Sequence, residues 1–126
     1  MEFENDERLY RAVLPGSIFW RHDGTLTSAA LKDRKGLSTD RQMRRPHEDC
    51  IEFMRKRLRG SIVSVSCENC EEAKAIVQYD KKDDNVFHTL ILPDADKLQL
   101  TNGQAKRLAV WARIDYREDN SEGNEI

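Results

Sequence analysis

Three cysteines and one histidine form the pattern in this chain that most resembles a metal site. His47 and Cys50 are three residues apart, and Cys67 and Cys70 repeat this spacing further along the chain. Three thiols and one imidazole in two pairs suit tetrahedral zinc, so a structural zinc-bound module is one hypothesis. The alternative is that Cys50 packs in the core and the other two cysteines are incidental, because a chain of this length folds without a metal. We expect no cofactor and keep zinc at these four residues as the alternative.

A second group of residues could serve an enzyme: Arg11, Ser28 and His88. Arg11 lies among apolar residues, where a guanidinium needs a carboxylate or carbonyl partner, so it either braces the fold or faces a cleft for an anionic ligand. His88 also has apolar neighbours, and its ring is either hydrogen-bonded within the fold or available as an acid or base. Neither Ser28 nor Ser38 has a neighbouring histidine or a glycine elbow, so the sequence does not predict a nucleophilic serine.

The densest positive charge lies between residues 32 and 59. This segment has ten basic and five acidic residues, a net charge of +5, in a chain whose total is −2. Such a surface could contact an acidic protein or neutralise phosphates of a nucleic acid. The alternative is a solvated helix face, since cations at a helix C-terminus are stabilised by the helix dipole. The candidate partner-binding residues are Arg44, Arg45, Arg55, Lys56, Arg57 and Arg59.

Hydrophobic periodicity and turn residues predict the elements that hold these side chains. A helix is predicted over 46–59, because Pro46 suits its first turn, acidic residues come first, cations come last and Gly60 follows it. Its apolar stripe includes Cys50, which is therefore expected to pack in the core. Alternating and apolar runs predict strands, and residues 33–46 read as a long surface loop. The other predicted elements are strands at 9–14, 17–20, 61–66, 76–79 and 86–92, a helical turn or two within 25–32, a short helix at 68–75 and a last helix at 102–114.

These elements predict a single α+β domain of 126 residues with a mixed sheet of about five strands. Two main helices and one or two short ones accompany the sheet, the ordered core spans about 8–116, and the acidic tail 117–126 is expected to be disordered. Hydrophobic residues make up 38% of the chain and charged residues 35%, a composition that is polar but compatible with folding. The odd cysteine count and acidic N-terminus lead us to expect free thiols and a cytoplasmic location.

The order LYR, TSAALKD, GLSTDR and VFHTLIL resembles small single-domain bacterial proteins, a resemblance that implies no activity. An early strand arginine followed by a Ser-Thr-rich block is also similar to ADP-ribosyltransferase-like folds, in which these residues hold a dinucleotide. That resemblance implies this role for Arg11 and the pair Thr27-Ser28, whereas the glutamate that such enzymes place on a late strand has no counterpart here.

From these observations we expect a cytoplasmic interaction domain without enzymatic activity. Its basic helix and loop would bind an acidic protein partner or nucleic acid. The alternative is a small nucleotide-directed enzyme, similar to ADP-ribosyltransferases, that uses Arg11, Ser28 and His88.

Overall fold

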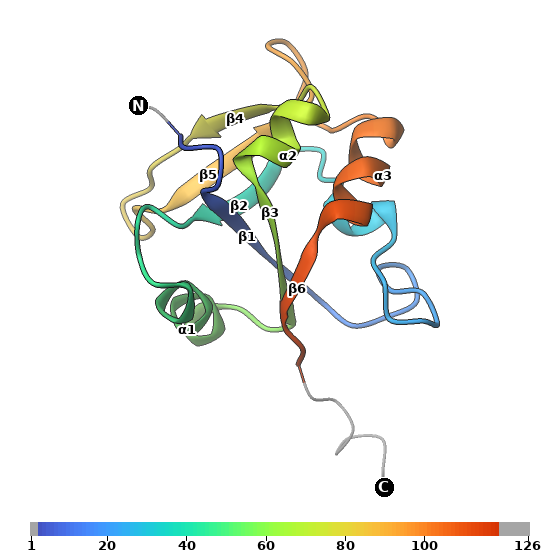
Figure 1. Ribbon diagram of the computed structural model, residues 1–126, viewed down its shortest axis with the longest axis horizontal. Coiled ribbons are helices and arrows are strands. Elements are labelled where there is room, and N and C mark those ends of the chain that lie inside the picture. The colour runs from blue at the N-terminus through green and yellow to red at the C-terminus, as the bar shows by residue number, and fades with distance from the viewer. Residues whose placement is uncertain (1–2, 119–126) are drawn as a thin grey trace, which may run out of the picture.

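The computed structural model describes residues 3–118, which form one antiparallel sheet of six strands with three α-helices. The sheet order is β4-β5-β2-β1-β3-β6, and every strand pairing is antiparallel (Figure 1). The predicted α+β class is therefore confirmed, but the sheet has six strands rather than five and is not mixed. The strands are β1 (Arg8–Val13), β2 (Leu37–Arg41), β3 (Ser61–Ser66), β4 (Ile76–Tyr79), β5 (His88–Leu92) and β6 (Arg113–Tyr116).

The helices cover both faces of the sheet. They are α1 (His47–Arg57), α2 (Cys67–Glu72), α3 (Asn102–Trp111) and a short 3-10 helix, η1 (Ser28–Leu31). Successive side chains of a strand point to opposite faces, and β1 shows this division. Leu9 packs with buried residues of η1, α2 and α3, whereas Tyr10 packs with Cys50 and Met54 of α1. Helix α1 thus lies on one face of the sheet, and α2, α3 and η1 lie on the other (Figure 1).

Helix α1 forms where the sequence predicts it. Pro46 precedes its first residue, Glu48 and Asp49 occupy the first turn, and the last turn carries three cations. These charges complement the helix dipole at both ends. Gly60 then turns the chain into β3 with φ 109°, and a Cβ built there would lie 2.5 Å from the Val13 carbonyl oxygen. This connection therefore requires glycine both for its backbone conformation and for its close approach to β1.

The other two α-helices begin with reciprocal capping. The Ser66 hydroxyl accepts the amide proton of Asn69, and the Asn69 side chain accepts from the Ser66 amide. Thr101 and Gln104 form the same capping box at the start of α3. Because each box satisfies two otherwise unpaired donors, both helix starts are fixed locally by the sequence.

Three predicted elements are wrong. Strand β2 lies within the predicted loop 33–46, and β6 occupies the end of the predicted helix 102–114. The segment 17–20 is not a strand, because it forms turns that end in an isolated bridge between Trp20 and Leu26. No helix within residues 3–118 has the length and apolar character needed to cross a membrane.

The predicted tail begins at residue 117, but only its first two residues are described. Arg117 donates to the Gly24 carbonyl at 2.9 Å, and the Glu118 amide donates to the Ser61 hydroxyl at 2.9 Å. These contacts extend the ordered chain past the predicted limit of 116. The remainder of the predicted tail, 119–126, lies outside the described residues.

Candidate active site

Strands β1 and β2 separate near the middle of the sheet. They pair only at Leu9 with Arg41 and at Tyr10 with Asp40, whereas β1 pairs with β3 along its full length. Beyond Tyr10 the two strands are joined by a side chain rather than by backbone hydrogen bonds. Arg11 Nη1 donates to the Ser38 carbonyl oxygen at 3.0 Å. The gap therefore exposes part of β2 toward α1 within an otherwise continuous sheet.

A cleft of about 350 Å³ opens at this gap. We call it the β1–β2 cleft, and its size falls in the range of small-molecule pockets. Its walls combine two cations with apolar side chains, two of which, Leu14 and Leu58, are 53% and 46% exposed. The lining residues are Arg11 and Ala12 of β1, Leu14 just after it, Ser38, Thr39 and Asp40 of β2, Met54 of α1, and Leu58 and Arg59 just after α1.

Arg11 carries a half-buried charge that neutral groups hold in place. Its Nε donates to the Ala30 carbonyl at 3.0 Å, and its Nη1 donates to the Ser38 carbonyl at 3.0 Å. No ion pair among residues 3–118 involves Arg11, and burial lowers its pKa. The charge of Asp33 partly offsets this effect of burial on the Arg11 pKa. A cation withdrawn from water with no carboxylate at ion-pair distance favours binding of an anion beside it. Arg11 thus joins β1 to η1 and β2 and also lines a cleft, and its role toward an anionic ligand stays a prediction.

His88 connects Ser38 to Asp80. His88 Nδ1 lies 3.0 Å from Asp80 Oδ2 and 3.1 Å from the Asp80 backbone oxygen, and His88 Nε2 lies 3.2 Å from Ser38 Oγ. Both neighbours of Nδ1 are acceptors, so the proton of a neutral imidazole sits on Nδ1. Nε2 is then free to accept the Ser38 hydroxyl proton, which is the arrangement of a serine, a base and an orienting carboxylate.

The two serines considered from the sequence lie at different places in the structure. Ser28 starts η1 and is not among the residues that line the β1–β2 cleft, whereas Ser38 lines it and is exposed. The expectation that Ser38 has no neighbouring histidine is therefore wrong. The histidine is fifty positions away in sequence and becomes a neighbour because β2 pairs with β5 in a register that aligns Asp40 with His88.

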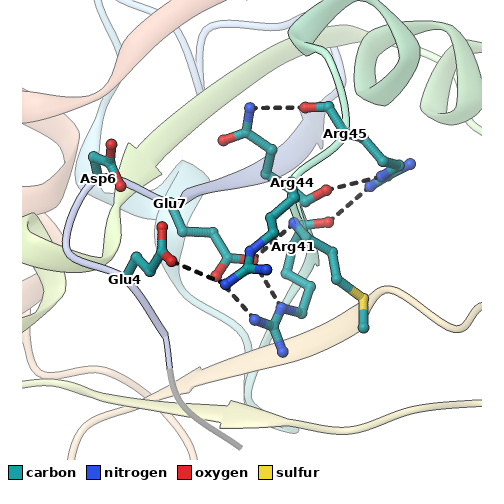
Figure 2. A pocket seen from close by; sticks show the side chains of 8 residues that line it. Glu4, Asp6, Glu7, Arg41, Arg44 and Arg45 are labelled. Carbon is teal, nitrogen blue, oxygen red and sulfur yellow. Dashed lines mark hydrogen bonds and ion pairs between the residues drawn. The ribbon is translucent and has the colours of Figure 1, made fainter.

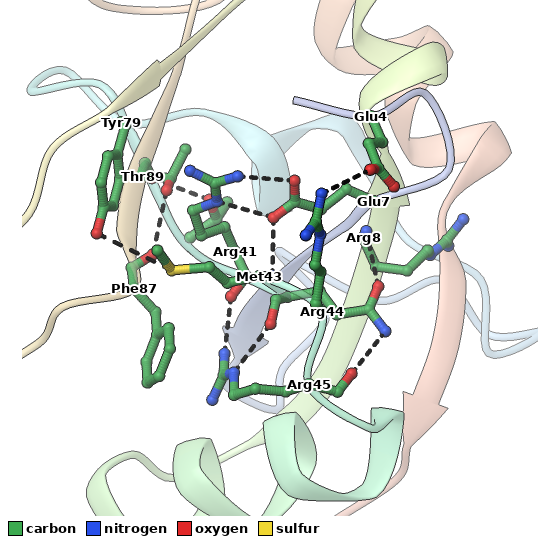
Figure 3. A network of polar contacts seen from close by, with 12 residues as sticks. Glu4, Glu7, Arg8, Arg41, Met43, Arg44, Arg45, Tyr79, Phe87 and Thr89 are labelled. Carbon is green, nitrogen blue, oxygen red and sulfur yellow. Dashed lines mark hydrogen bonds and ion pairs between the residues drawn. The ribbon is translucent and has the colours of Figure 1, made fainter. Parts of the chain in front are cut away.

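A larger cavity of about 530 Å³ lies at the other end of β2, between the N-terminal arm and the loop after β2 (Figure 2). At its base, Glu7 accepts from Arg41 Nε at 2.8 Å, Arg41 Nη2 at 2.9 Å and the Met43 amide at 2.8 Å (Figure 3). The Arg41 guanidinium also lies over the Phe3 and Tyr79 rings, 4.1 and 4.9 Å from their centroids. Because the charges of Glu7 and Arg41 pair with one another, we infer that these residues stabilise the fold at this end of the sheet rather than bind a ligand.

The loop beside this cavity has an unusual backbone. Met43 and Arg44 have φ values of 55° and 64°, in the left-handed region that non-glycine residues rarely adopt. In this turn the Met43 amide donates to Glu7 at 2.8 Å, so the buried carboxylate stabilises the strained segment.

The predicted basic surface is only partly free. Arg45 donates to the Arg41 and Gln42 carbonyls and lies over the Phe87 ring, 3.4 Å from its centroid. The remaining candidates differ in their contacts. Arg57 pairs with Asp40, Arg55 lies over the Tyr116 ring, Lys56 pairs with Glu52 at 3.9 Å, Arg44 pairs with Glu4 at 3.2 Å, and Arg59 lines the β1–β2 cleft.

The four candidate zinc ligands do not converge. Cys50 packs with Tyr10 on the α1 face, whereas Cys67 and Cys70 pack with Leu9 on the opposite face. All three cysteines are free and buried, and burial raises the pKa of the Cys67 and Cys70 thiols to about 12. The predicted core position of Cys50 is confirmed.

His47 belongs to a different polar cluster from the thiols. Its Nδ1 lies 2.9 Å from the Tyr10 hydroxyl, and its Nε2 lies 3.8 Å from Asp115 Oδ1, which also contacts Arg113. Burial raises the pKa of Tyr10, so this hydroxyl stays protonated. The cluster ties the start of α1 to β1 and β6.

The sequence predicted Arg11 and His88 as candidate site residues, whereas it did not point to Ser38, Asp80 or the position of Arg59 at the cleft. The contact between Ser38 and His88 could have been predicted only by pairing the GLSTDR segment with VFHTLIL, which requires that GLSTDR be predicted as a strand. Comparisons with known proteins found no match, whether to protein-family models, curated proteins or solved structures.

Proposed function

We propose that this protein is a small nucleotide-directed enzyme whose substrate binds in the β1–β2 cleft. The proposal rests on the half-buried Arg11, whose hydrogen-bond partners within residues 3–118 are carbonyl oxygens. One of these partners is Ser38, whose hydroxyl lies 3.2 Å from His88 Nε2. A phosphate group would supply the missing negative charge, and Arg59 lines the same cleft.

The apolar part of the cleft suits the rest of a nucleotide. Leu14, Met54 and Leu58 form a surface against which a base or ribose can pack, while the cations hold the phosphates. His88, with its proton on Nδ1, is placed to act as the general base at the Ser38 end.

The resemblance to ADP-ribosyltransferase-like folds supports the same ligand class. The early arginine of that resemblance, Arg11, lines the β1–β2 cleft, whereas its Ser-Thr pair, Thr27-Ser28, does not, and Ser38 and Thr39 line the cleft instead. Such enzymes carry a glutamate on a late strand, whereas β5 of this chain carries His88 beside Ser38. We therefore propose nucleotide binding with histidine-assisted chemistry.

The test is calorimetric titration of the protein with ADP, NAD⁺ and inorganic phosphate. We expect ADP or NAD⁺ to bind, and Arg59→Ala to raise Kd about tenfold or more, because it removes a charge-assisted hydrogen bond of about 1.5–3 kcal/mol. Lys56→Ala is the matched control, since it removes an exposed cation near the end of α1, three residues before Arg59, that lies outside the cleft. No binding of any of the three compounds, or equal loss in both variants, would contradict the proposal.

Binding of an acidic partner or nucleic acid through the basic helix is a second proposal. It is favoured by the exposure of Arg44 and Lys56, whose side chains are 87% and 71% exposed. The same two variants separate the proposals, because the basic-surface proposal expects Lys56→Ala to weaken binding of a DNA or RNA oligonucleotide measured by fluorescence anisotropy.

A further inference from the structure

We propose that Ser38 is a nucleophile, activated by His88 and Asp80, that forms a covalent intermediate with the phosphorus of a phosphate ester or anhydride. The inference deepens the proposed function and rests on it for the natural substrate, because it names the attacking atom in the same cleft.

The position of Ser38 meets the requirements of a nucleophile. The residue is exposed and lines the β1–β2 cleft, so a bound substrate can reach its hydroxyl. Its Oγ lies 3.2 Å from His88 Nε2, within reach for proton transfer. Arg11 donates to the Ser38 carbonyl, so the cation that would hold a phosphate is fixed to the same residue that would attack it.

The sheet holds the three residues rigidly. Ser38 and His88 lie on the neighbouring strands β2 and β5, which pair continuously from Leu37 to Asp40. The Asp80 amide donates to the His88 carbonyl at 2.9 Å, so its carboxylate is held against the ring by its own backbone. Asp80 is therefore a positioning residue that fixes the tautomer and orientation of His88.

The reaction balances with water as the second reactant. Ser38 Oγ attacks phosphorus, an O–P bond forms, and the Ser38 proton moves to His88 Nε2. The bridging O–P bond of the substrate breaks, and the leaving oxygen takes its electron pair and receives the proton from Nε2. Water then attacks the same phosphorus and gives a proton to Nε2, the bond between Ser38 Oγ and phosphorus breaks, and Oγ takes that proton from Nε2. Arg11 stabilises the negative charge in both steps.

The test is treatment of the full chain with a fluorophosphonate, which reports a nucleophilic serine without any nucleotide. Attack by Ser38 would form an O–P bond and expel fluoride, leaving a single adduct that intact-protein and peptide mass spectrometry would place on Ser38. We expect no adduct in Ser38→Ala and a labelling rate about 100-fold lower in His88→Ala, the lower end of general-base contributions. Asp80→Asn should slow labelling about tenfold or more, as loss of the group that orients a histidine does.

Ser28→Ala is the matched control, because Ser28 lies outside the cleft, and it should be labelled at the unaltered rate. Thermal unfolding of each variant checks folding, and His88→Gln replaces His88→Ala if the latter unfolds. An adduct on another residue, no adduct, or equal labelling of the His88 variant would overturn the inference. Failure of labelling with intact ADP binding would refute only the nucleophile, whereas labelling without nucleotide binding would refute the proposed substrate class.

Discussion

Replacing Glu7 by glutamine should cause a large loss of stability, because Glu7 is the buried carboxylate of the ion pair with Arg41. The side chains of Arg41 and Glu7 are 4% and 8% exposed, and Glu7 accepts three hydrogen bonds at 2.8–2.9 Å. Glutamine keeps the size of the side chain but removes its charge and one acceptor oxygen. Breaking a buried pair in this way costs about 3–5 kcal/mol, and we expect about 3 kcal/mol because no cavity is created.

The neighbouring pair of Glu4 and Arg44 supplies the control. It joins the same two segments at 3.2 Å, but its side chains are 65% and 87% exposed, so Glu4→Gln should change stability by about 0–1 kcal/mol. Urea unfolding followed by the fluorescence of Trp20 and Trp111 gives the free energy of unfolding of each variant. If the free energy of unfolding falls equally in the two variants, within about 0.5 kcal/mol, the buried pair of Glu7 and Arg41 does not stabilise this end of the sheet more than the exposed pair does, and the assignment is refuted.

Two further predictions concern the backbone and the thiols. Gly60→Ala should lower the free energy of unfolding by about 2 kcal/mol or more, because the new Cβ would clash with the Val13 carbonyl and alanine is strained at a positive φ. Gly16→Ala is the control, since Gly16 also has a positive φ, 129°, but no atom lies within 4 Å of the added Cβ. Urea unfolding of Gly16→Ala should therefore show the backbone strain alone. Equal losses would contradict the steric argument. Burial raises the pKa of Cys67 and Cys70 to about 12, so both should remain protonated and unreactive toward a disulfide reagent at pH 8 and should react once urea exposes them. Rapid reaction of either thiol in the folded protein would contradict this prediction.

The well-marked elements were predictable because their signals are local. Helix α1 has Pro46 before it, acids first and cations last, and β3 and β4 were predicted with their observed bounds. Strand β2 was missed because two of its inward-facing residues, Thr39 and Arg41, are polar and are buried only by partners elsewhere in the chain. Strand β6 was missed because Ile114 continues the apolar spacing of α3, so the predicted helix ran into the strand.

The site was predictable only in part, for a related reason. Arg11 stands out as a cation within an apolar run, and His88 as an imidazole within a strand, so single positions revealed both. The contact between His88 and Ser38 depends on the register of β2 with β5, which no local pattern encodes. Asp80 likewise gains its role only through the turn that brings it back to His88.

The most direct test of the account is an NMR titration of the isotopically labelled protein with ADP. We predict the largest changes in the Arg11 side-chain Nε signal and in the backbone amides of Ser38 and His88, because Arg11 and Ser38 line the β1–β2 cleft and the His88 ring contacts Ser38 from the neighbouring strand β5. Changes confined to the cavity of Glu7 and Arg44, or no saturable change at all, would contradict the assignment of the β1–β2 cleft as the nucleotide site.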